Sequence, residues 1–258
     1  MTAADDYVNA DFKLRNVCRR WGSRVALNGV NVEIGNREKV ALIGPSGGGK
    51  STLIRLLAGV LRPSSGSVKV NGSDIAGFSR KRLKLHRRRC GIIQQGHMLV
   101  PQLNVHQNVL SGALSNWPWY KVALASIAHL ERPRVQMLLK SLGLADYQWE
   151  TVQNLSGGQM QRVAVARALI AEPSVLLADE ATASLDPTTA RNVTSLIIDQ
   201  ANTRNTTLFF CTHWVDLVMQ RSDRIIGIRD GQICLNAPPG QVSDEDLEYL
   251  YRGSDERQ

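Results

Sequence analysis

The chain has 258 residues, enough for one α/β domain with a substantial buried core. Hydrophobic residues make up 43% and charged residues 21%, ordinary values that exclude a disordered or low-complexity chain. No stretch approaches the roughly 20 consecutive apolar residues of a membrane-spanning helix, and the first residues lack the basic cluster and apolar run of a secretory signal. We therefore expect a protein that is made and kept in the cytoplasm.

The early part of the chain predicts a small antiparallel sheet. Short strands with alternating apolar residues are predicted at Phe12–Arg19, Gly29–Ile34 and Ser67–Val70. We expect this sheet to lie beside a larger one.

Four apolar runs predict the buried strands of that larger sheet, at Val40–Ile43, Val175–Ala178, Thr207–Cys211 and Arg224–Ile228. Helical patterns around 159–170 and 189–201 lie ahead of the second and third of these strands. Strands that alternate with helices in this way favour a mainly parallel sheet covered on both faces, so the expected fold class is α/β.

Much of the formal net charge of +8 lies in one segment, residues 80–89 (RKRLKLHRRR). Three interpretations are open: a solvated helix face, contact with an anionic membrane surface or an acidic partner, and contact with nucleic acid. Because no aromatic residues are interleaved for base stacking, we expect no nucleic-acid partner.

From about residue 96 to 155 helical patterns dominate, which predicts a helical insertion within the same domain. Residues 117–120 (WPWY) lie in this insertion, and two interpretations of them are open. The aromatic side chains could anchor an interface with a partner, or they could be buried inside the insertion. From Ala237 onward the sequence predicts a peripheral helix with its N-cap at Ser243.

The four cysteines, Cys18, Cys90, Cys211 and Cys234, are far apart in sequence. They do not form the close pairs that are typical of a zinc site. A disulfide framework would be odd without a secretory signal, so we expect reduced and mostly buried side chains.

Residues 44–51 (GPSGGGKS) match the phosphate-binding pattern G-x-x-x-x-G-K-[ST] at every fixed position. A predicted strand precedes this loop and a helical pattern follows it, so backbone N–H groups and the helix start can face an anion. Lys50 supplies a charge for the β- and γ-phosphates, and the Ser51 hydroxyl can bind Mg²⁺.

An apolar strand that ends in Asp179 and Glu180 supplies the second half of the predicted site. Asp179 would lie at the carboxyl edge of the sheet, beside the loop, and hold the magnesium shell. Glu180 is then placed to orient or deprotonate the attacking water.

Residues 155–169 (LSGGQMQRVAVARAL) resemble the signature sequence of ABC ATPases. The chain is similar to that family from about residue 12 to 231, and its other motifs come in the family's order. The resemblance implies a P-loop NTPase (RecA-like) fold and a chain that hydrolyses ATP.

By this resemblance, Trp21 matches the aromatic residue that stacks on adenine, and Gln95 the glutamine of the Q-loop. Residues 184–186, which end in Asp186, look like the D-loop. His213 looks like the switch histidine that contacts the γ-phosphate.

The implied cofactors are ATP and Mg²⁺. Catalytic roles fall to Glu180, His213 and Gln95, and the metal ligands would be Ser51, Gln95 and Asp179. Besides Trp21, Asp179 and Asp186, the implied nucleotide contacts are Gly44, Pro45, Ser46, Gly47, Gly48, Gly49, Lys50, Ser51, Thr52, Ser156, Gly157, Gly158 and Gln159.

The turn at Ser156 opens a helix and is a second anion site, because free N–H groups and the positive helix end meet there. In the family this turn faces the phosphate loop of another subunit. One copy of each motif then implies a homodimer with two ATP molecules between the subunits. Two departures from the family are Gln94 in place of an aromatic residue and Ala181 in place of a proline.

The expected organisation is a single nucleotide-binding domain over residues 1–258. Residues of about 1–94 and 159–236 would form the ATPase core, including the antiparallel part. Residues of about 96–158 would form a helical subdomain with the signature, and 237–258 a tail.

A finer resemblance, in residues 108–114, 178–187 and the tail, is to ATPase subunits of phosphonate and phosphite importers. It implies two membrane permease subunits, a periplasmic or extracellular solute-binding protein, and a peripheral place on the inner face of the cell membrane. Polar amino-acid importers and lipoprotein-releasing exporters share most of the same sequence. A non-transport ATPase of a phosphonate-processing complex is the alternative from another class.

Overall fold

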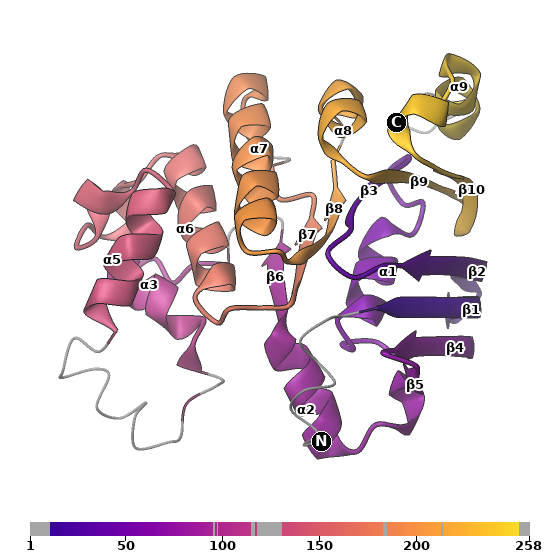
Figure 1. Cartoon of the computed structure of the whole chain (residues 1–258), viewed down its shortest axis with the longest axis horizontal. Helices are drawn as coiled ribbons and strands as arrows, with labels where there is room; N and C mark the ends of the chain where they lie inside the picture. The colour runs from indigo at the N-terminus through magenta and orange to yellow at the C-terminus, as the bar shows by residue number, and fades with distance from the viewer. Residues whose placement is uncertain are drawn as a thin grey trace.

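The computed structural model describes residues 11–94, 96, 98–114, 117, 131–182, 185–212 and 214–252. It contains a four-stranded sheet, a six-stranded sheet and the helices that cover them (Figure 1). The helices α3 and α5 stand at the far side of the larger sheet from the small sheet.

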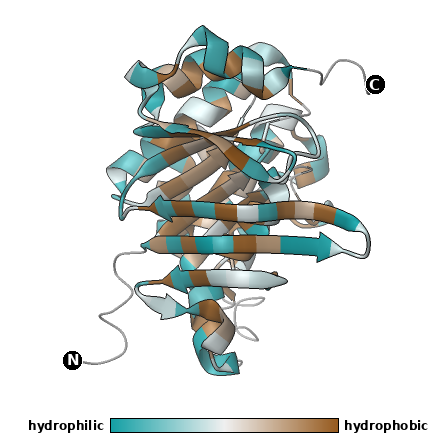
Figure 2. Ribbon diagram, turned by 90° about the vertical axis from the view of Figure 1, so that its right-hand side faces the viewer, coloured by the Kyte–Doolittle hydropathy of each residue, from teal (hydrophilic) through white to brown (hydrophobic). Residues whose placement is uncertain are grey.

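The small sheet is antiparallel and has the strand order β2-β1-β4-β5. Its strands are β1 (Phe12–Trp21), β2 (Arg24–Ile34), β4 (Ser65–Val70) and β5 (Ser73–Asp74). Hydrophobic and hydrophilic residues alternate along the strands in Figure 2, because every second side chain faces the core. The predicted antiparallel sheet is confirmed, and its first hairpin extends further than expected, to the pair Trp21 and Arg24.

The larger sheet has the order β10-β9-β3-β8-β7-β6, and all neighbours are parallel except β10 and β9. Its strands are β3 (Lys39–Ile43), β6 (Cys90–Gln94), β7 (Val175–Asp179), β8 (Thr207–Cys211), β9 (Arg224–Arg229) and β10 (Gln232–Ala237). The four predicted buried strands are confirmed. The edge strands β6 and β10 were not predicted, because each mixes polar residues into a short run.

Helices connect these strands. They are α1 (Lys50–Leu57), α2 (Arg80–Arg89), α3 (Val105–Ser111), α5 (Arg132–Ser141), α6 (Gly157–Leu169), α7 (Pro187–Thr203), α8 (Val215–Arg221) and α9 (Asp244–Tyr251). Short 3-10 turns lie at Ile75–Gly77, Ala145–Tyr147, Val152–Asn154 and Pro239–Gln241. The helical patterns around 159–170 and 189–201 are confirmed as α6 and α7, and Ser243 caps α9 as predicted.

The larger sheet buries both of its faces. Val40 and Leu42 of β3 pack into a core that the sheet shares with α1 and the small sheet. Ala41 and Ile43 point the other way, into a core that includes residues of α3, α5, α6 and α7. This double burial explains why these strands read as continuous apolar runs rather than as alternating ones.

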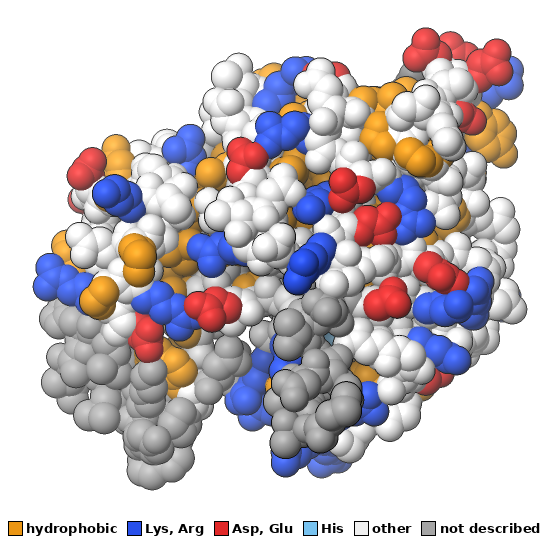
Figure 3. All heavy atoms as spheres, in the orientation of Figure 1, with side chains coloured by type: hydrophobic (Ala, Val, Ile, Leu, Met, Phe, Trp, Pro, Cys, Tyr) orange, Lys and Arg blue, Asp and Glu red, His pale blue; other side chains and the backbone are white. Residues whose placement is uncertain are grey.

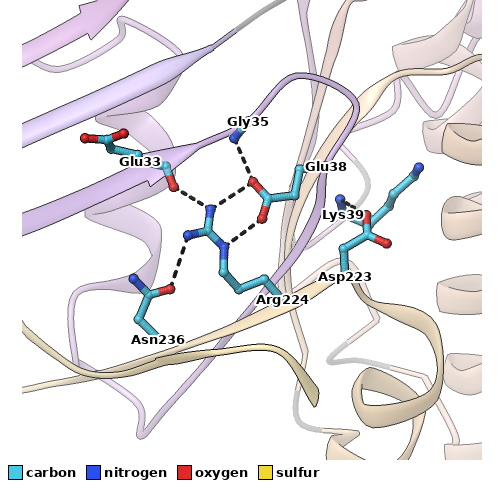
Figure 4. A network of polar contacts seen from close by, with 7 residues as sticks. All are labelled: Glu33, Gly35, Glu38, Lys39, Asp223, Arg224 and Asn236. Atoms are coloured by element: carbon cyan, nitrogen blue, oxygen red, sulfur yellow. Dashed lines mark hydrogen bonds and ion pairs between the residues drawn. The ribbon is translucent and has the colours of Figure 1, made fainter. Parts of the chain in front are cut away.

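The two sheets are tied together by Arg224 (Figure 4). Its Nε lies 2.7 Å from Oε1 of Glu38, its Nη2 donates to Oε2 of the same carboxylate at 2.8 Å, and it also donates to the Glu33 carbonyl. Both partners are about one-fifth exposed, so water screens this pair less than a surface pair. The bidentate pair fixes the start of β3 against β9 and the end of β2.

The basic run forms α2, and part of it faces inward. His86 is 2% exposed and its Nε2 lies 2.8 Å from the Leu57 carbonyl. Arg87 donates to the Gly59 carbonyl from Nε at 3.0 Å and from Nη2 at 2.7 Å. Arg80, Lys81, Lys84 and Arg87 are exposed, so the run keeps a solvated face while His86 packs inward.

All four cysteines are free. Cys90 and Cys211 are buried, Cys18 is intermediate and Cys234 is exposed, so the expectation of mostly buried thiols holds for half of them. Trp117 is partly buried and packs against the core, as the packing interpretation of this segment expects. Residues 118–120 lie outside the described residues.

Helices α3 and α6 meet at a point where a side chain has no room. A Cβ on Gly112 would lie 1.9 Å from the Arg167 carbonyl oxygen and 2.9 Å from Ile170 Cγ2. We expect Gly112→Ala to lower the free energy of unfolding by about 1–3 kcal/mol, because the two helices must move apart. Urea denaturation of the purified chain measures this change in the free energy of unfolding.

Gly77→Ala is the matched control, because a Cβ there would meet no atom within 4 Å. Equal stability of the Gly112 and Gly77 variants would contradict the close approach of α3 and α6.

Candidate active site

The phosphate loop runs from β3 into α1 and depends on glycine at both of its ends. Gly44 has φ +144°, and a Cβ there would lie 2.1 Å from the Ile228 carbonyl oxygen. Gly49, the N-cap of α1, has φ +111°, and a Cβ there would lie 2.6 Å from the Ala26 carbonyl oxygen. A side chain at either position would clash with these carbonyl oxygens, so the loop needs glycine there. This curled backbone is the form in which loop N–H groups can face a phosphate.

Lys50, the first residue of α1, is a buried cation at 4% exposure. Its Nζ donates to the carbonyls of Gly44 at 2.9 Å and Pro45 at 3.1 Å. The Glu180 carboxylate lies 3.1 Å away, at Oε1. A buried ammonium needs such partners, and these three hold it at the mouth of the loop.

Ser51 and Asp179 form the adjoining pair. The Ser51 hydroxyl donates to Oδ1 of Asp179 at 2.9 Å, and Asp179 is 8% exposed. Burial raises the pKa of the Asp179 carboxyl, while the hydrogen bond from Ser51 opposes that rise. Both groups offer hard oxygen atoms at the carboxyl edge of the sheet, the donor set that Mg²⁺ prefers.

Glu180 follows β7 in a left-handed conformation, with φ +45°. Such a backbone is uncommon for a residue other than glycine, and it turns the chain sharply at the end of the strand. The carboxylate is about one-fifth exposed, so it can meet both Lys50 and water.

Lys50, Ser51 and Glu180 line a cavity of about 440 Å³. Its lining residues are Trp21, Arg24, Ala26, Gly47, Gly49, Lys50, Ser51, Thr52 and Glu180. The β1–β2 hairpin therefore forms one wall, and the loop with the end of β7 forms the other. The volume is in the range of small-molecule sites.

Trp21 and Arg24 belong to the hairpin wall. The Trp21 side chain is 47% exposed, and the Arg19 guanidinium lies over its ring at 4.0 Å from the centroid. A cation on one face leaves the other face available to stack on a flat base. Sequence reasoning missed Arg24, although the Gly-Ser turn between Trp21 and Arg24 could have indicated that the two residues face each other.

The signature residues lie elsewhere. Ser156 caps α6: its hydroxyl accepts from the Gln159 amide at 3.3 Å, and its own amide donates to Oε1 of Gln159 at 2.8 Å. Gly158 packs against Thr189 of α7, where a Cβ would lie 2.5 Å from Cγ2. Asp186 caps α7 by accepting from the Thr189 amide at 3.0 Å, and this hydrogen bond lowers the pKa of its carboxyl.

Within one chain, the loop residues, Trp21 and Glu180 lie together around the cavity, and Asp179 lies beside them. The signature residues pack against the start of α7 near Asp186, and neither the signature residues nor Asp186 line the cavity. Gln95, Ser184 and His213 lie outside the described residues, so their predicted roles stay predictions. Gln94, which precedes Gln95, is the register partner of Asp179 in the β6–β7 ladder.

A family model described as ABC transporter matches residues 27–183. The chain belongs to the ABC transporter family. That match spans the phosphate loop, the Asp179–Glu180 pair and the signature. ABC membership makes the chain an ATPase that binds ATP, as the motifs predicted.

Two curated relatives cover most of the chain. The phosphonates import ATP-binding protein PhnC of Wolinella succinogenes is 39% identical over 240 residues, which are 93% of this chain and 87% of the relative. The hypophosphite import ATP-binding protein HtxD of Stutzerimonas stutzeri is 37% identical over 240 residues, 93% of this chain and 70% of the relative.

Solved ABC structures share the fold. CbiO1 of Clostridium perfringens, part of the ABC transporter complex cbiONQ, superimposes with a TM-score of 0.78 at 30% identity, over 95% of this chain and 94% of that one. The dimeric bacterial ABC transporter cassette MJ0796 gives a TM-score of 0.76 at 29% identity, over 88% of this chain and 98% of that one. The predicted P-loop NTPase fold, with its antiparallel sheet and helical insertion, is confirmed.

For Glu180→Gln we expect hydrolysis to fall at least about 10²-fold, because an amide cannot accept the proton of the attacking water. ATP binding should persist, since the loop and Lys50 are unchanged. Steady-state hydrolysis and ATP titration measure the two effects. Glu172→Gln is a matched control, because Glu172 also has a positive φ but is an exposed acid that pairs with Arg134. Turnover at the unmodified rate in the Glu180 variant would rule out its role as the base.

For Trp21→Ala we expect ATP affinity to fall about 5- to 150-fold, the loss of a stacking interaction of about 1–3 kcal/mol. The maximal hydrolysis rate should change little, because stacking acts on the ground and transition states alike. Trp149→Ala is the control: Trp149 is 44% exposed, like Trp21, but stacks on His106 away from the cavity. Equal ATP affinities in the two variants would contradict base stacking.

Proposed function

We propose that this chain is the ATP-hydrolysing subunit of an ABC importer for phosphonate or phosphite, and that it works as a homodimer. The observation that carries the motor assignment is the meeting of Lys50, Ser51 and Glu180 at one cavity, with Asp179 hydrogen-bonded to Ser51. The names of the relatives support the cargo.

ATP binding begins at the loop. Its backbone N–H groups and the start of α1 receive the phosphates, and Trp21 receives the base. Lys50 then exchanges the Glu180 carboxylate for β- and γ-phosphate oxygens, which are stronger partners because they carry more charge. The exchange removes the Lys50 ammonium from the Glu180 carboxylate, which can then accept a proton from water. The binding of ATP thereby prepares Glu180 to act as the general base.

Ser51, Asp179 and Gln95 would hold Mg²⁺, which neutralises charge that develops on the β- and γ-phosphate oxygens. The 2.9 Å hydrogen bond between Ser51 and Asp179 supports this pairing, since it brings two oxygen ligands together. His213 would contact the γ-phosphate, and Glu180 would deprotonate the attacking water.

A second subunit would complete each site. Ser156, Gly157, Gly158 and Gln159 open α6 with N–H groups and a positive helix end, yet they line no part of the cavity in their own chain. In a two-fold dimer they would face the γ-phosphate held by the partner's loop, with Asp186 nearby. The dimeric cassette MJ0796 supports this arrangement.

The motor would act on a membrane permease pair, at the inner face of the cell membrane, with a solute-binding protein on the far side. No helix in the described parts of the chain is long and apolar enough to span a membrane. The proposed organisation is one domain over residues 1–258, with the core at about 1–94 and 159–236, the helical part at 96–158 and the tail at 237–258.

The cargo is tested by reconstituting the chain with a candidate membrane permease pair and solute-binding protein. We expect ATP hydrolysis by the complex to rise several-fold when the binding protein carries methylphosphonate or phosphite. Phosphate and polar amino acids serve as the comparison ligands, and a Glu180→Gln complex sets the background. Stimulation by an amino acid and by no phosphorus oxyanion would overturn the cargo and leave the motor assignment intact.

A further inference from the structure

The last turn of the basic helix α2 faces a hollow rather than open solvent. Lys and Arg side chains gather around α2 at the lower edge of the molecule (Figure 3). Arg88 and Arg89, which end the helix, are half-buried and line a hollow of about 530 Å³. Its other walls come from the α6–β7 and α7–β8 connections, which contribute Glu172 and Arg204 among others. Residues far apart in the sequence thus meet at one concave site.

This hollow lies at the opposite edge of the larger sheet from the ATP cavity. The strands β6, β7 and β8 run parallel, and they begin directly after the segments that line the hollow. Their amino ends therefore share one edge of the sheet, whereas Asp179 lies at the carboxyl edge. The hollow and the ATP cavity share no lining residue in the part of the chain that the structure describes. The hollow is a separate place on the molecule.

Positive charge exceeds negative charge in the hollow. Arg88, Arg89 and Arg204 line it, and Glu172 is the one acid among the lining residues that the structure describes. The Glu172 carboxylate is already paired, because its Oε1 lies 2.9 Å from Nη2 of Arg134. Guanidinium groups stay charged at every physiological pH. An anion that entered the hollow would therefore meet three cations and one acid that is engaged elsewhere.

Two of these arginines have donors to spare. The Arg88 Nε is buried and has no hydrogen-bond partner within the described residues. A buried N–H group without an acceptor costs about 1–3 kcal/mol, and an anion in the hollow would supply that acceptor. Arg204 donates from Nε to Oε1 of Gln200 at 3.3 Å, and this bond leaves its two Nη groups for a ligand.

Arg88 also lines a smaller neighbouring hollow of about 280 Å³, together with Arg87 and Arg167. Both of these neighbours donate to backbone carbonyls, Arg87 to Gly59 and Arg167 to Met98. Burial lowers the pKa of the Arg167 guanidinium, because a cation loses solvation there. Arg88 is thus common to two cationic hollows, and an anion beside it would relieve the repulsion among like charges.

We propose that the larger hollow binds a phosphoryl anion, with Arg88 as its main ligand and Arg89 and Arg204 beside it. The anion is the phosphate of a soluble compound or the headgroup of an anionic lipid. A guanidinium suits either one, because its parallel N–H groups match two phosphate oxygens. The volume is sufficient for a phosphate with a small organic group. The bound anion would link α2 to the two connections that form the other walls.

The inference does not depend on the proposed cargo. For its test, the full-length chain carries Lys50→Ala, so that the phosphate loop does not bind the probe. This parent chain is titrated with inorganic phosphate by calorimetry, and sodium chloride keeps the ionic strength constant. Flotation with vesicles of equal parts phosphatidylcholine and phosphatidylglycerol presents the lipid headgroup instead, and vesicles of phosphatidylcholine alone are the comparison.

We expect Arg88→Gln to weaken the binding of one of these probes about 10-fold or more, the effect of losing charge-assisted hydrogen bonds. Phosphate binding that depends on Arg88, with flotation unchanged, identifies a soluble ligand. Flotation on the mixed vesicles that depends on Arg88, with little binding of free phosphate, identifies a lipid headgroup. For a soluble ligand, the rise in the unfolding midpoint that phosphate produces should shrink in parallel.

Lys84→Gln is the matched control, because Lys84 is an exposed cation of the same helix and lines neither hollow. It should bind the probe nearly as well as the parent chain. Arg204→Gln, an exposed position on another element, should weaken the same probe as Arg88→Gln does, and it serves if the Arg88 variant fails to fold. Equal weakening in the Lys84 and Arg88 variants would overturn the site in favour of diffuse surface charge. A parent chain that binds neither probe would also overturn it.

Discussion

The placement of one buried cation governs the site. The Lys50 ammonium is 4% exposed, and it persists there because two loop carbonyls and the Glu180 carboxylate surround it. Each of these partners depends on another part of the fold: the carbonyls on a loop path that requires Gly44, and Glu180 on a left-handed turn after β7. A shift in β3, β7 or β9 would move one partner and leave charge buried without compensation. The mainly parallel sheet is therefore the frame that aligns substrate binding with the proposed base.

The same geometry supports the proposal that one chain holds only part of each ATP site. The cavity has one wall that can hold the adenine and a loop that can hold the phosphates. The second helix start that could bind a γ-phosphate, at the beginning of α6, does not line this cavity. Ser156 and Gln159 satisfy each other there through a capping box, and Asp186 caps the neighbouring helix. These groups are thus held in place before any partner arrives. Two copies, related by a two-fold axis, would use both helix starts on each ATP.

Sequence reasoning predicted the elements whose signal is local. Buried strands read as apolar runs, the loop reads as glycines before Lys50 and Ser51, and Ser243 reads as a helix cap. It missed what only tertiary contact creates: the edge strands β6 and β10, the guanidinium of Arg19 over Trp21, and Arg24 in the cavity wall. It also treated 80–89 as one basic run, whereas helical periodicity turns His86 inward.

The central claim, that ATP is bound between two subunits, is tested by mixing two variants in the Glu180→Gln background. One carries Lys50→Ala and the other Ser156→Arg, with different tags, and light scattering measures ATP-dependent dimers. If the sites are shared, neither variant dimerises alone, because both of its sites are broken. The mixture, however, should form a heterodimer with one intact site, made of the loop of one chain and the signature of the other. A mixture that stays monomeric, while Glu180→Gln alone dimerises with ATP, would contradict the shared site.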